Sequence, residues 1–307
     1  MISEVKQDVN KKIKGRVIYN EPMRRHTSFR IGGPADIWVE PEDVDDLKNC
    51  ILFSRHGKIP LFIMGNGTNL LVRDEGIRGI VVNMPAASLK NIYCGKRSIS
   101  ATSSVTLKEL LDFCSNKNLG GLEFLTGIPG SVGGAVLTNA GARHHERLGE
   151  WRSIGDFVEE LKIMDHDGEI SILNKKELAF GYRSLDLRDS VILEAKFLLN
   201  EAPRKDILNE CQKFLRRKRE TQELGAPSAG CIFKNPAETD KSAGELIDNC
   251  DLKGTRIGGA EISKKHANFI VNTNNASSND VITLIDLAKD KVKDRFGVEL
   301  SLEIKIV

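Results

Sequence analysis

The sequence has no excess of either charge. Its 307 residues include 45 lysines and arginines against 43 aspartates and glutamates, for a formal net charge of +2. Such an even balance provides no broad field that would attract nucleic acid or a membrane surface without specificity. The length suits about two domains. The composition, 40% hydrophobic and 29% charged, is typical of a globular protein.

Hydrophobic runs and paired cysteines are also missing. The longest segment without a charged residue, 124–142, is long enough to cross a membrane, but five glycines and Pro129 interrupt it. The first 15 residues contain no apolar core of the kind that a secretory signal requires. Six cysteines occur without a C-x-x-C pair, and there is no H-E-x-x-H motif. We therefore expect a cytoplasmic protein with reduced thiols and no metal site.

Glycine is abundant in one region. Seven of the 27 glycines fall between Gly120 and Gly141, where Gly127–Ala135 reads GIPGSVGGA. Pro129 fixes one backbone angle while its glycine neighbours permit positive φ, so this loop can be stiff and almost free of side chains. A loop of that kind suits a diphosphate or a flat ring lying against the backbone. A tight packing corner is the structural alternative, although a corner seldom needs seven glycines.

A second glycine motif, MGNGTNLL, occupies Met64–Leu71 directly after an apolar run. Small residues at the end of a strand let several backbone N–H groups converge on one anion. The motif is neither a Rossmann fingerprint, because Leu70 stands where a third glycine is required, nor a P-loop, because no Gly-Lys-Ser/Thr follows. An ordinary glycine turn is the alternative. Together the two motifs suggest a large dinucleotide-like ligand.

Short β-type runs separated by glycine dominate the first 200 residues, with only two helices expected among them. One helix follows Pro41, and the other follows Thr106, which forms a capping box with Glu109. Strands and helices do not alternate regularly, which favours an α+β fold over a doubly wound sheet. Beyond a boundary near 201–203, the pattern predicts helices over 204–220, 242–250 and 278–296 and a final strand over 298–307.

These motifs, in this order, resemble the UDP-N-acetylenolpyruvoylglucosamine reductases, flavoenzymes of peptidoglycan precursor synthesis with a vanillyl-alcohol-oxidase-like fold. The resemblance covers residues 20 to 307 approximately. It is carried by TSFRIGGPAD (Thr27–Asp36), GNGTNLLV (Gly65–Val72), GIPGSVGGAVLTNAGA (Gly127–Ala142), FGYRSL (Phe180–Leu185), PSAGCIFKNP (Pro227–Pro236) and the segment Ala243–Asn272.

The resemblance implies an α+β fold whose PCMH-type FAD-binding domain, residues 20–200, has two subdomains (20–85 and 86–200). A C-terminal α+β substrate-binding domain is expected over 201–297, and the strand 298–307 is expected to return to the FAD-binding domain. FAD is the implied cofactor and NADPH the hydride-donating cosubstrate. The implied FAD-binding residues are Arg30, Gly65, Asn66, Gly67, Thr68, Asn69, Leu70, Gly127, Ile128, Pro129, Gly130, Ser131, Gly133 and Gly134.

In the family reaction, UDP-N-acetylglucosamine enolpyruvate is reduced to UDP-N-acetylmuramate. NADPH reduces FAD and leaves, the flavin delivers hydride to C3 of the enolpyruvyl group, and C2 receives a proton. The resemblance implies that Arg183 steadies the substrate carboxylate and the enolate, which suits a guanidinium fork. It also implies that Glu303 assists Arg183. The structural alternatives are a surface arginine in a turn and an outward residue on a terminal strand.

Cys231 stands where the family pattern has a proton-donating serine. A thiol is a stronger acid than an alcohol, so donation to C2 is chemically reasonable, and a small buried thiol is the alternative. Substrate contacts are expected from Tyr182, Arg217, Arg219 and Asn235. One or two cations of the basic stretch 216–219 are expected to meet the diphosphate, and a solvated helix face is the alternative. His266 and Asn268 are expected to be structural.

The short spacing between Arg183 and Cys231 leaves no room for the tyrosine-bearing insertion of type I members, which indicates type II. Two rival functions stay open: another flavin oxidoreductase of the same fold, and a non-catalytic UDP-sugar-binding relative. We expect a monomer or weak oligomer that binds the enolpyruvyl substrate and has neither nucleic acid nor a membrane as partner.

Overall fold

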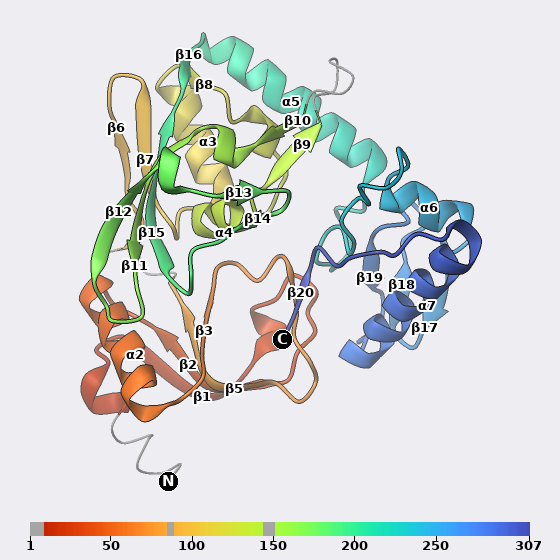
Figure 1. Ribbon diagram of the computed structural model, residues 1–307, viewed down its shortest axis with the longest axis horizontal. Coiled ribbons are helices and arrows are strands. Elements are labelled where there is room, and N and C mark those ends of the chain that lie inside the picture. Colours follow the sequence, from red (N-terminus) through yellow and green to blue (C-terminus); the bar gives the residue numbers. More distant parts are fainter. Residues whose placement is uncertain (1–8, 85–88, 144–150) are drawn as a thin grey trace. The chain divides into compact units, whose positions relative to one another are not determined.

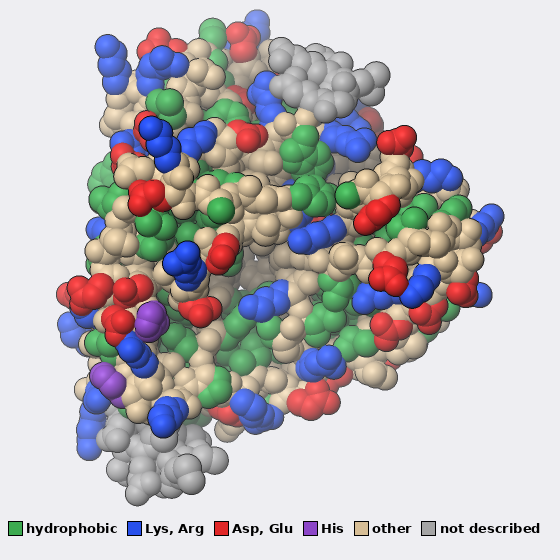
Figure 2. Space-filling view, viewed as in Figure 1, with side chains coloured by type: hydrophobic (Ala, Val, Ile, Leu, Met, Phe, Trp, Pro, Cys, Tyr) green, Lys and Arg blue, Asp and Glu red, His purple; other side chains and the backbone are tan. Residues whose placement is uncertain are grey.

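The computed structural model describes residues 9–84, 89–143 and 151–307. Helices and strands are mixed along the chain, which confirms the predicted α+β class (Figure 1). The chain forms two compact units. Unit 1 consists of Met1–Tyr19, Ile37–Asn66 and Gly79–Arg217, and unit 2 consists of Asn20–Asp36, Gly67–Arg78 and Lys218–Val307. Acidic and basic side chains are interspersed over the face shown in Figure 2, as the even charge balance predicts.

Unit 1 contains a five-stranded antiparallel sheet. Its strands are β6 (Ile92–Cys94), β7 (Ser98–Thr102), β11 (Val158–Met164), β12 (Ile170–Asn174) and β15 (Val191–Leu198), in the order β12-β11-β15-β7-β6. The helices α3 (Leu107–Asn116) and α4 (Val132–Leu137) lie on one side of this sheet (Figure 1). Ala195 and Phe197 of β15 point into the same buried core as Leu110 and Val136 of these helices. Burial therefore alternates with the usual period of two from Glu194 to Phe197, whereas Ile192 and Leu193 are both buried, in different cores.

Three short antiparallel pairs and most of a long helix also belong to unit 1. The pairs are β8 (Leu119–Gly120) with β16 (Asn200–Glu201), β9 (Gly141–Arg143) with β10 (Trp151–Ser153), and β13 (Phe180–Gly181) with β14 (Ser184–Leu185). The helix α5 (Arg204–Thr221) begins in unit 1, and its residues from Lys218 onward belong to unit 2.

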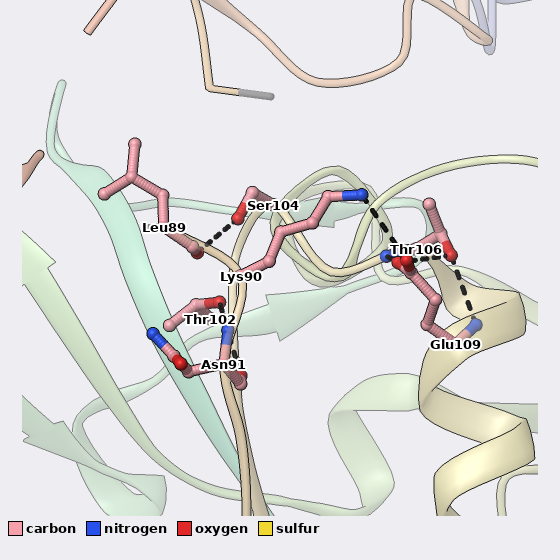
Figure 3. Close-up of polar contacts among 7 residues, drawn as sticks. All are labelled: Leu89, Lys90, Asn91, Thr102, Ser104, Thr106 and Glu109. Carbon is pink, nitrogen blue, oxygen red and sulfur yellow. Dashed lines mark hydrogen bonds and ion pairs between the residues drawn. The ribbon is translucent and has the colours of Figure 1, made fainter. Parts of the chain in front are cut away.

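The start of α3 shows how a local sequence signal defines an element (Figure 3). The Glu109 N–H donates to Thr106 Oγ1 at 3.1 Å, and the Thr106 N–H donates to Glu109 Oε2 at 2.8 Å, which is the predicted capping box. Lys90 Nζ lies 3.4 Å from Glu109 Oε1. The hydroxyl of Ser104 donates to the carbonyl of Leu89 at 2.5 Å. These contacts hold the segment that leads into β6 against the turn that starts the helix.

A second sheet has the strand order β1-β2-β5-β3, formed by β1 (Arg16–Pro22), β2 (Pro34–Glu40), β5 (Ile77–Asn83) and β3 (Leu61–Met64). Strands β3 and β5 are parallel. The helix α2 (Val44–Gly57) joins β2 to β3, and the side chain of Asp43 caps its first turn by accepting from Asp46 N at 2.7 Å. Leu47 of α2 is buried with Val39 and Ile80 of the sheet.

Asp46 anchors the N-terminal segment to α2. This carboxylate is fully buried and accepts from the N–H groups of Lys14 (2.9 Å), Gly15 (2.8 Å) and Glu42 (3.0 Å). We expect Asp46→Ala to lower the free energy of unfolding by about 3 kcal/mol, because buried backbone donors lose a charged acceptor. Urea unfolding measures the change. Asp45→Ala removes an exposed acid of the same turn and is the control; equal losses in the two variants would contradict the prediction.

Unit 2 is built around a three-stranded antiparallel sheet with two helices. The elements are β17 (Arg256–Ile257), β18 (Ala260–Ile262), β19 (Ile270–Asn272), α6 (Ala243–Asn249) and α7 (Ser278–Phe296). Leu246 and Leu284 of the two helices are buried in one core, which Phe29, Ile31 and Leu71 enter from the first eighty residues of the chain. The predicted helix over 278–296 is confirmed, and its Ser277 cap is part of a capping box.

The predicted final strand over 298–307 is wrong. Only β20 (Lys305–Ile306) is regular, and it pairs in parallel with β4 (Leu70–Leu71). The preceding residues pair elsewhere: Ser301 O accepts from Lys234 N, and Glu303 N donates to Ile232 O. Because the segment changes its partner within a few residues, it cannot form one continuous ladder.

The expected domain limits at residues 200 and 297 stay a prediction, and the two compact units are divided differently along the chain. Segments 20–36 and 67–78 belong with the C-terminal residues. The physical reason is burial, since Phe29, Ile31 and Leu71 complete the core that α6 and α7 form.

Candidate active site

The glycine loop 127–134 is fixed to the segment that precedes α3. Its carbonyl at Gly130 accepts from Leu107 N at 3.0 Å, while Gly133 N donates to Ser103 O at 2.9 Å. A Cβ added at Gly133 would lie 2.7 Å from the Cβ of Ser103. At this position the missing side chain serves packing within the protein, which is what the packing-corner interpretation expects. The loop is thus a rigid feature of unit 1.

The two glycine motifs are neighbours in space. A Cβ added at Gly65 would lie 2.5 Å from Ser131 Oγ, so the end of β3 lies against the start of α4. Ser131 caps α4 by accepting from Gly134 N at 3.3 Å. The amide of Asn83 donates to Gly65 O at 2.7 Å and holds the end of β3. The fold therefore brings together two motifs that the sequence could only pair by composition.

The loop residues present fit a diphosphate or a flat ring. Gly127 (φ +74°) and Gly130 (φ +150°) adopt backbone conformations that side chains disfavour, on either side of the exposed Pro129. A Cβ added at Gly134 would meet nothing closer than Ser131 Oγ at 3.5 Å, so the backbone there is open to approach. Backbone without side chains is the surface that a dinucleotide cofactor such as FAD requires.

Gly65 gives a direct test of this cradle. We expect Gly65→Val to weaken FAD binding by roughly ten- to hundredfold, because the added atoms displace Ser131 and overpack the junction of the two motifs. Flavin released per polypeptide and an FAD titration of the apoprotein measure the effect. Gly225→Ala is the control, since a Cβ there meets nothing closer than 3.7 Å. Full flavin content in Gly65→Val would contradict the prediction.

The remainder of the first motif lies in unit 2, beside the C-terminal segment. The Asn69 amide donates to Glu303 O at 3.1 Å, and Lys305 N donates to Asn69 O at 3.0 Å. Gly67 (φ +62°) accepts at its carbonyl from Ser28 N at 3.1 Å. The turn that contains Ser28 also carries Arg30, which is exposed and has a φ of +56°. Asn69 and Glu303, both predicted site residues, are therefore adjacent although 234 residues separate them.

Cys231 lies in a segment whose backbone pairs with two neighbouring segments. On one side it forms an isolated antiparallel bridge with Phe269. On the other side, Glu303 N donates to the carbonyl of the next residue, Ile232, at 2.8 Å. Cys231 itself is partly exposed, and the space around Gly230 Cα is open, since an added Cβ would meet no atom within 4 Å. The backbones that carry Cys231 and Glu303 are thus neighbours in unit 2.

Asn268 holds the Cys231 segment in place through hydrogen bonds to its backbone, which the sequence did not predict in detail. Its Oδ1 accepts from Phe233 N at 2.9 Å, its Nδ2 donates to Phe233 O at 2.8 Å, and its carbonyl accepts from Ile232 N at 2.9 Å. His266 Nδ1 accepts from Asn268 N at 3.2 Å. Burial and the nearby Lys253 lower the pKa of His266, which favours the neutral ring that can accept this bond. The structural expectation for both residues agrees with these contacts.

Arg183 is in unit 1, in the turn between β13 and β14. Its backbone is left-handed (φ +55°), and Nη1 donates to Gly141 O at 3.1 Å. The amide of Asn139 donates to Gly181 O at 2.8 Å, and its Oδ1 accepts from Gly155 N at 3.1 Å. The turn with Arg183 is therefore tied to the residues that follow α4 and the glycine loop. Tyr182, in the same turn, is 46% exposed.

The residues proposed to bind substrate on α5 and before α6 differ in their exposure and in their contacts. Arg217 and Arg219 are both exposed on α5, whereas Lys218 between them is buried, one helical turn after the buried Phe214. The Asn235 side chain accepts from Ala243 N at 3.1 Å, so it caps the start of α6. The period of the helix around Phe214 could have identified Lys218 as the inward-facing cation.

Other features bear on the chemistry of the site. Burial raises the pKa of Cys50 and Cys114 to about 12, so these thiols stay protonated at neutral pH.

Among the residues that the structure describes, no group of His, Cys, Asp and Glu side chains could hold a metal ion. Within the same described residues, no helix is long and apolar enough to span a membrane.

Family models match two separate parts of the chain, and a known relative matches its full length. A model of the FAD binding domain matches residues 35–174, and one of the UDP-N-acetylenolpyruvoylglucosamine reductase C-terminal domain matches residues 222–307. A relative from Caldanaerobacter subterraneus subsp. tengcongensis named UDP-N-acetylenolpyruvoylglucosamine reductase is 42% identical over 100% of this chain and 99% of its own length.

Solved structures give the same result. The crystal structure of UDP-N-acetylenolpyruvylglucosamine reductase from Thermus caldophilus superposes with a TM-score of 0.79 at 32% identity, covering 96% of this chain and 99% of that one. A Phl p 4 variant described as a glucose oxidase, 14% identical with a TM-score of 0.50 over 66% of this chain and 44% of that one, shares the fold alone. The full-length similarity shows that this chain belongs to the UDP-N-acetylenolpyruvoylglucosamine reductase family.

Proposed function

We propose that this protein reduces UDP-N-acetylglucosamine enolpyruvate to UDP-N-acetylmuramate with NADPH, a step in making peptidoglycan precursors. Hydride chemistry is supplied by FAD when it is bound, with NADPH as the source. The observation that carries the proposal is the bond from the Asn69 amide to the Glu303 carbonyl, which joins the cofactor motif to the proposed acid–base residues. Full-length similarity to the reductase family supports the same activity.

Arg183 binds the carboxylate of the enolpyruvyl group. When hydride adds to C3, negative charge grows on C2 and spreads into this carboxylate, so a fixed cation stabilises the transition state more than the bound substrate. The contact of Nη1 with Gly141 O fixes one edge of the guanidinium before substrate arrives. Tyr182, exposed in the same turn, contacts the substrate beside it.

Cys231 donates the proton that C2 requires. One hydride at C3 and one proton at C2 together saturate the double bond, so the thiol must be reprotonated from solvent before the next turnover. Its partial exposure allows that exchange. Glu303, whose backbone neighbours the Cys231 segment, assists in stabilising the enolate or in handling this proton.

The nucleotide sugar is held by polar residues of unit 2 and of α5. Arg217 and Arg219 are exposed cations suited to the diphosphate, and the buried Lys218 adds a third candidate. Asn235 contacts the substrate with its side-chain amide, whose Oδ1 also accepts from Ala243 N. We place the protein in type II of the family, in the cytoplasm, and acting as a monomer or weak oligomer.

An anaerobic flavin titration tests the proposal. The purified protein should be yellow and release FAD on denaturation, and NADPH should bleach its absorbance near 450 nm. Adding the enolpyruvyl substrate without oxygen should then restore the absorbance in stoichiometric amount. UDP-N-acetylglucosamine, which lacks the enolpyruvyl group, is the matched control.

Two outcomes would replace the proposal by its rivals. Reoxidation by oxygen alone, never by the enolpyruvyl substrate, would indicate another flavin oxidoreductase of the same fold. A colourless protein that releases no flavin would indicate a non-catalytic relative.

A further inference from the structure

The guanidinium of Arg183 lies over the indole ring of Trp151. Its Cζ is 4.9 Å from the ring centroid, well within the range of a cation–π contact. Trp151 begins β10 and pairs with Arg143 of β9, in the same ladder that pairs Ser153 with Gly141. The arginine is therefore bound to both strands of this pair, to β10 through the indole and to β9 through the Gly141 carbonyl.

The indole ring is itself fixed. Its Nε1 donates to Ser153 Oγ at 2.9 Å, and Ser153 is buried. The Tyr182 ring meets it edge-on, with centroids 5.9 Å apart, and also lies 5.7 Å from Arg183 Cζ. Trp151 is thus held by a hydrogen bond and by an aromatic neighbour, so it provides a rigid surface for the guanidinium.

An aromatic face is a distinctive partner for an arginine. A ring attracts the cation through its quadrupole and uses none of the N–H donors of the guanidinium. The cation–π contact with Trp151 therefore orients the guanidinium from its face. The ordering of a long side chain is also completed before substrate binds.

We propose that Trp151 is a positioning residue, which holds Arg183 so that its guanidinium meets the carboxylate of the enolpyruvyl substrate. This inference rests on the proposed function, and it adds a residue that the sequence motifs do not include. Trp151 lies outside GIPGSVGGAVLTNAGA (Gly127–Ala142) and FGYRSL (Phe180–Leu185). It acts through Arg183 and needs no contact of its own with the reacting atoms.

Substitutions graded by ring character test the proposal. Trp151→Leu keeps an apolar side chain without a π face, and we expect it to raise KM for the enolpyruvyl substrate on the order of tenfold. Trp151→Phe keeps a ring with a weaker quadrupole, and the rise should be about threefold. Reduction of the flavin by NADPH should keep its wild-type rate in both. Tyr93→Leu, which removes an exposed aromatic of unit 1, is the control.

Fluorescence supplies a readout besides turnover. The protein has two tryptophans, so the difference in emission between wild type and Trp151→Phe isolates Trp151 from Trp38. This difference should change when the enolpyruvyl substrate is titrated and stay constant with UDP-N-acetylglucosamine, because only the former carries the carboxylate. The change should be lost in Arg183→Leu.

Each outcome bears on one claim. Wild-type KM in Trp151→Leu, or equal rises in the Leu and Phe variants, would overturn the role of Trp151 while leaving the proposed function intact. A wild-type enzyme that the enolpyruvyl substrate fails to reoxidise would instead overturn the proposed function. Graded KM values with a carboxylate-dependent emission change would support the inference.

Discussion

Arg183→Lys is expected to slow reoxidation of the flavin by the enolpyruvyl substrate by about a hundredfold, and Arg183→Leu by about a thousandfold. A lysine keeps the charge but offers a point contact in place of a planar fork, and it cannot keep both the carboxylate and the Gly141 carbonyl in the same geometry. The leucine variant removes the cation, so the charge that grows on C2 meets no fixed counter-charge. Anaerobic stopped-flow measurement of the two half-reactions gives the rates.

The flavin reduction by NADPH provides the internal control, because it does not involve the enolpyruvyl carboxylate and should stay at the wild-type rate. Arg188→Lys is the matched variant. Arg188 is exposed and has a φ of +46°, so a lysine there experiences the same left-handed backbone as a lysine at position 183, where φ is +55°. A fast second half-reaction in Arg183→Leu would remove this residue from the proposed mechanism.

Cys231→Ala is expected to lower the rate of the same half-reaction by about a hundred- to a thousandfold, because C2 loses its proton donor. Cys231→Ser restores a hydroxyl that can donate and should recover much of the loss. The two variants have similar volume, and the bonds that fix this segment are to backbone atoms. The difference in rate between the two variants therefore measures the loss of the proton donor and not a change in the fold.

A second thiol of unit 2 tests whether the effect is specific to Cys231. Cys250→Ala is the control, since Cys250 is another partly exposed thiol of unit 2 outside the proposed site. Near-wild-type turnover in Cys231→Ala would show that another group delivers the proton.

Much of the fold follows from local signals. The capping boxes at Thr106 and Ser277 join residues three positions apart, so they can be read from the sequence and they begin α3 and α7 where expected. The strand β11 likewise precedes a hairpin turn at Asp165–Gly168, and the helix α2 has acids in its first turn. Such signals act over a few residues and survive in almost any tertiary context.

Local sequence signals predict only part of the candidate site. The motifs identified the glycine loops and, by resemblance, Arg183, Cys231 and Glu303, yet Trp151 and Asn268 carry no signal of their own. A tryptophan or an asparagine is compatible with many surroundings. Their roles emerge from a cation–π contact and from a paired bond to the Phe233 backbone. Lys218 belongs to the basic stretch 216–219, and only the structure shows that it is the buried cation of that stretch.

The sequence by itself determined the two glycine-rich loops, the mixed α and β elements and the family, because these depend on residue types and short spacings. Only the tertiary structure decided that Gly65 lies against Ser131, that Asn69 bonds the Glu303 carbonyl, and that the last ten residues divide between two partners. These contacts join segments up to 234 residues apart. Such contacts depend on how distant segments pack together, as Phe29, Ile31 and Leu71 do in the core of α6 and α7, and no short window of sequence specifies that packing.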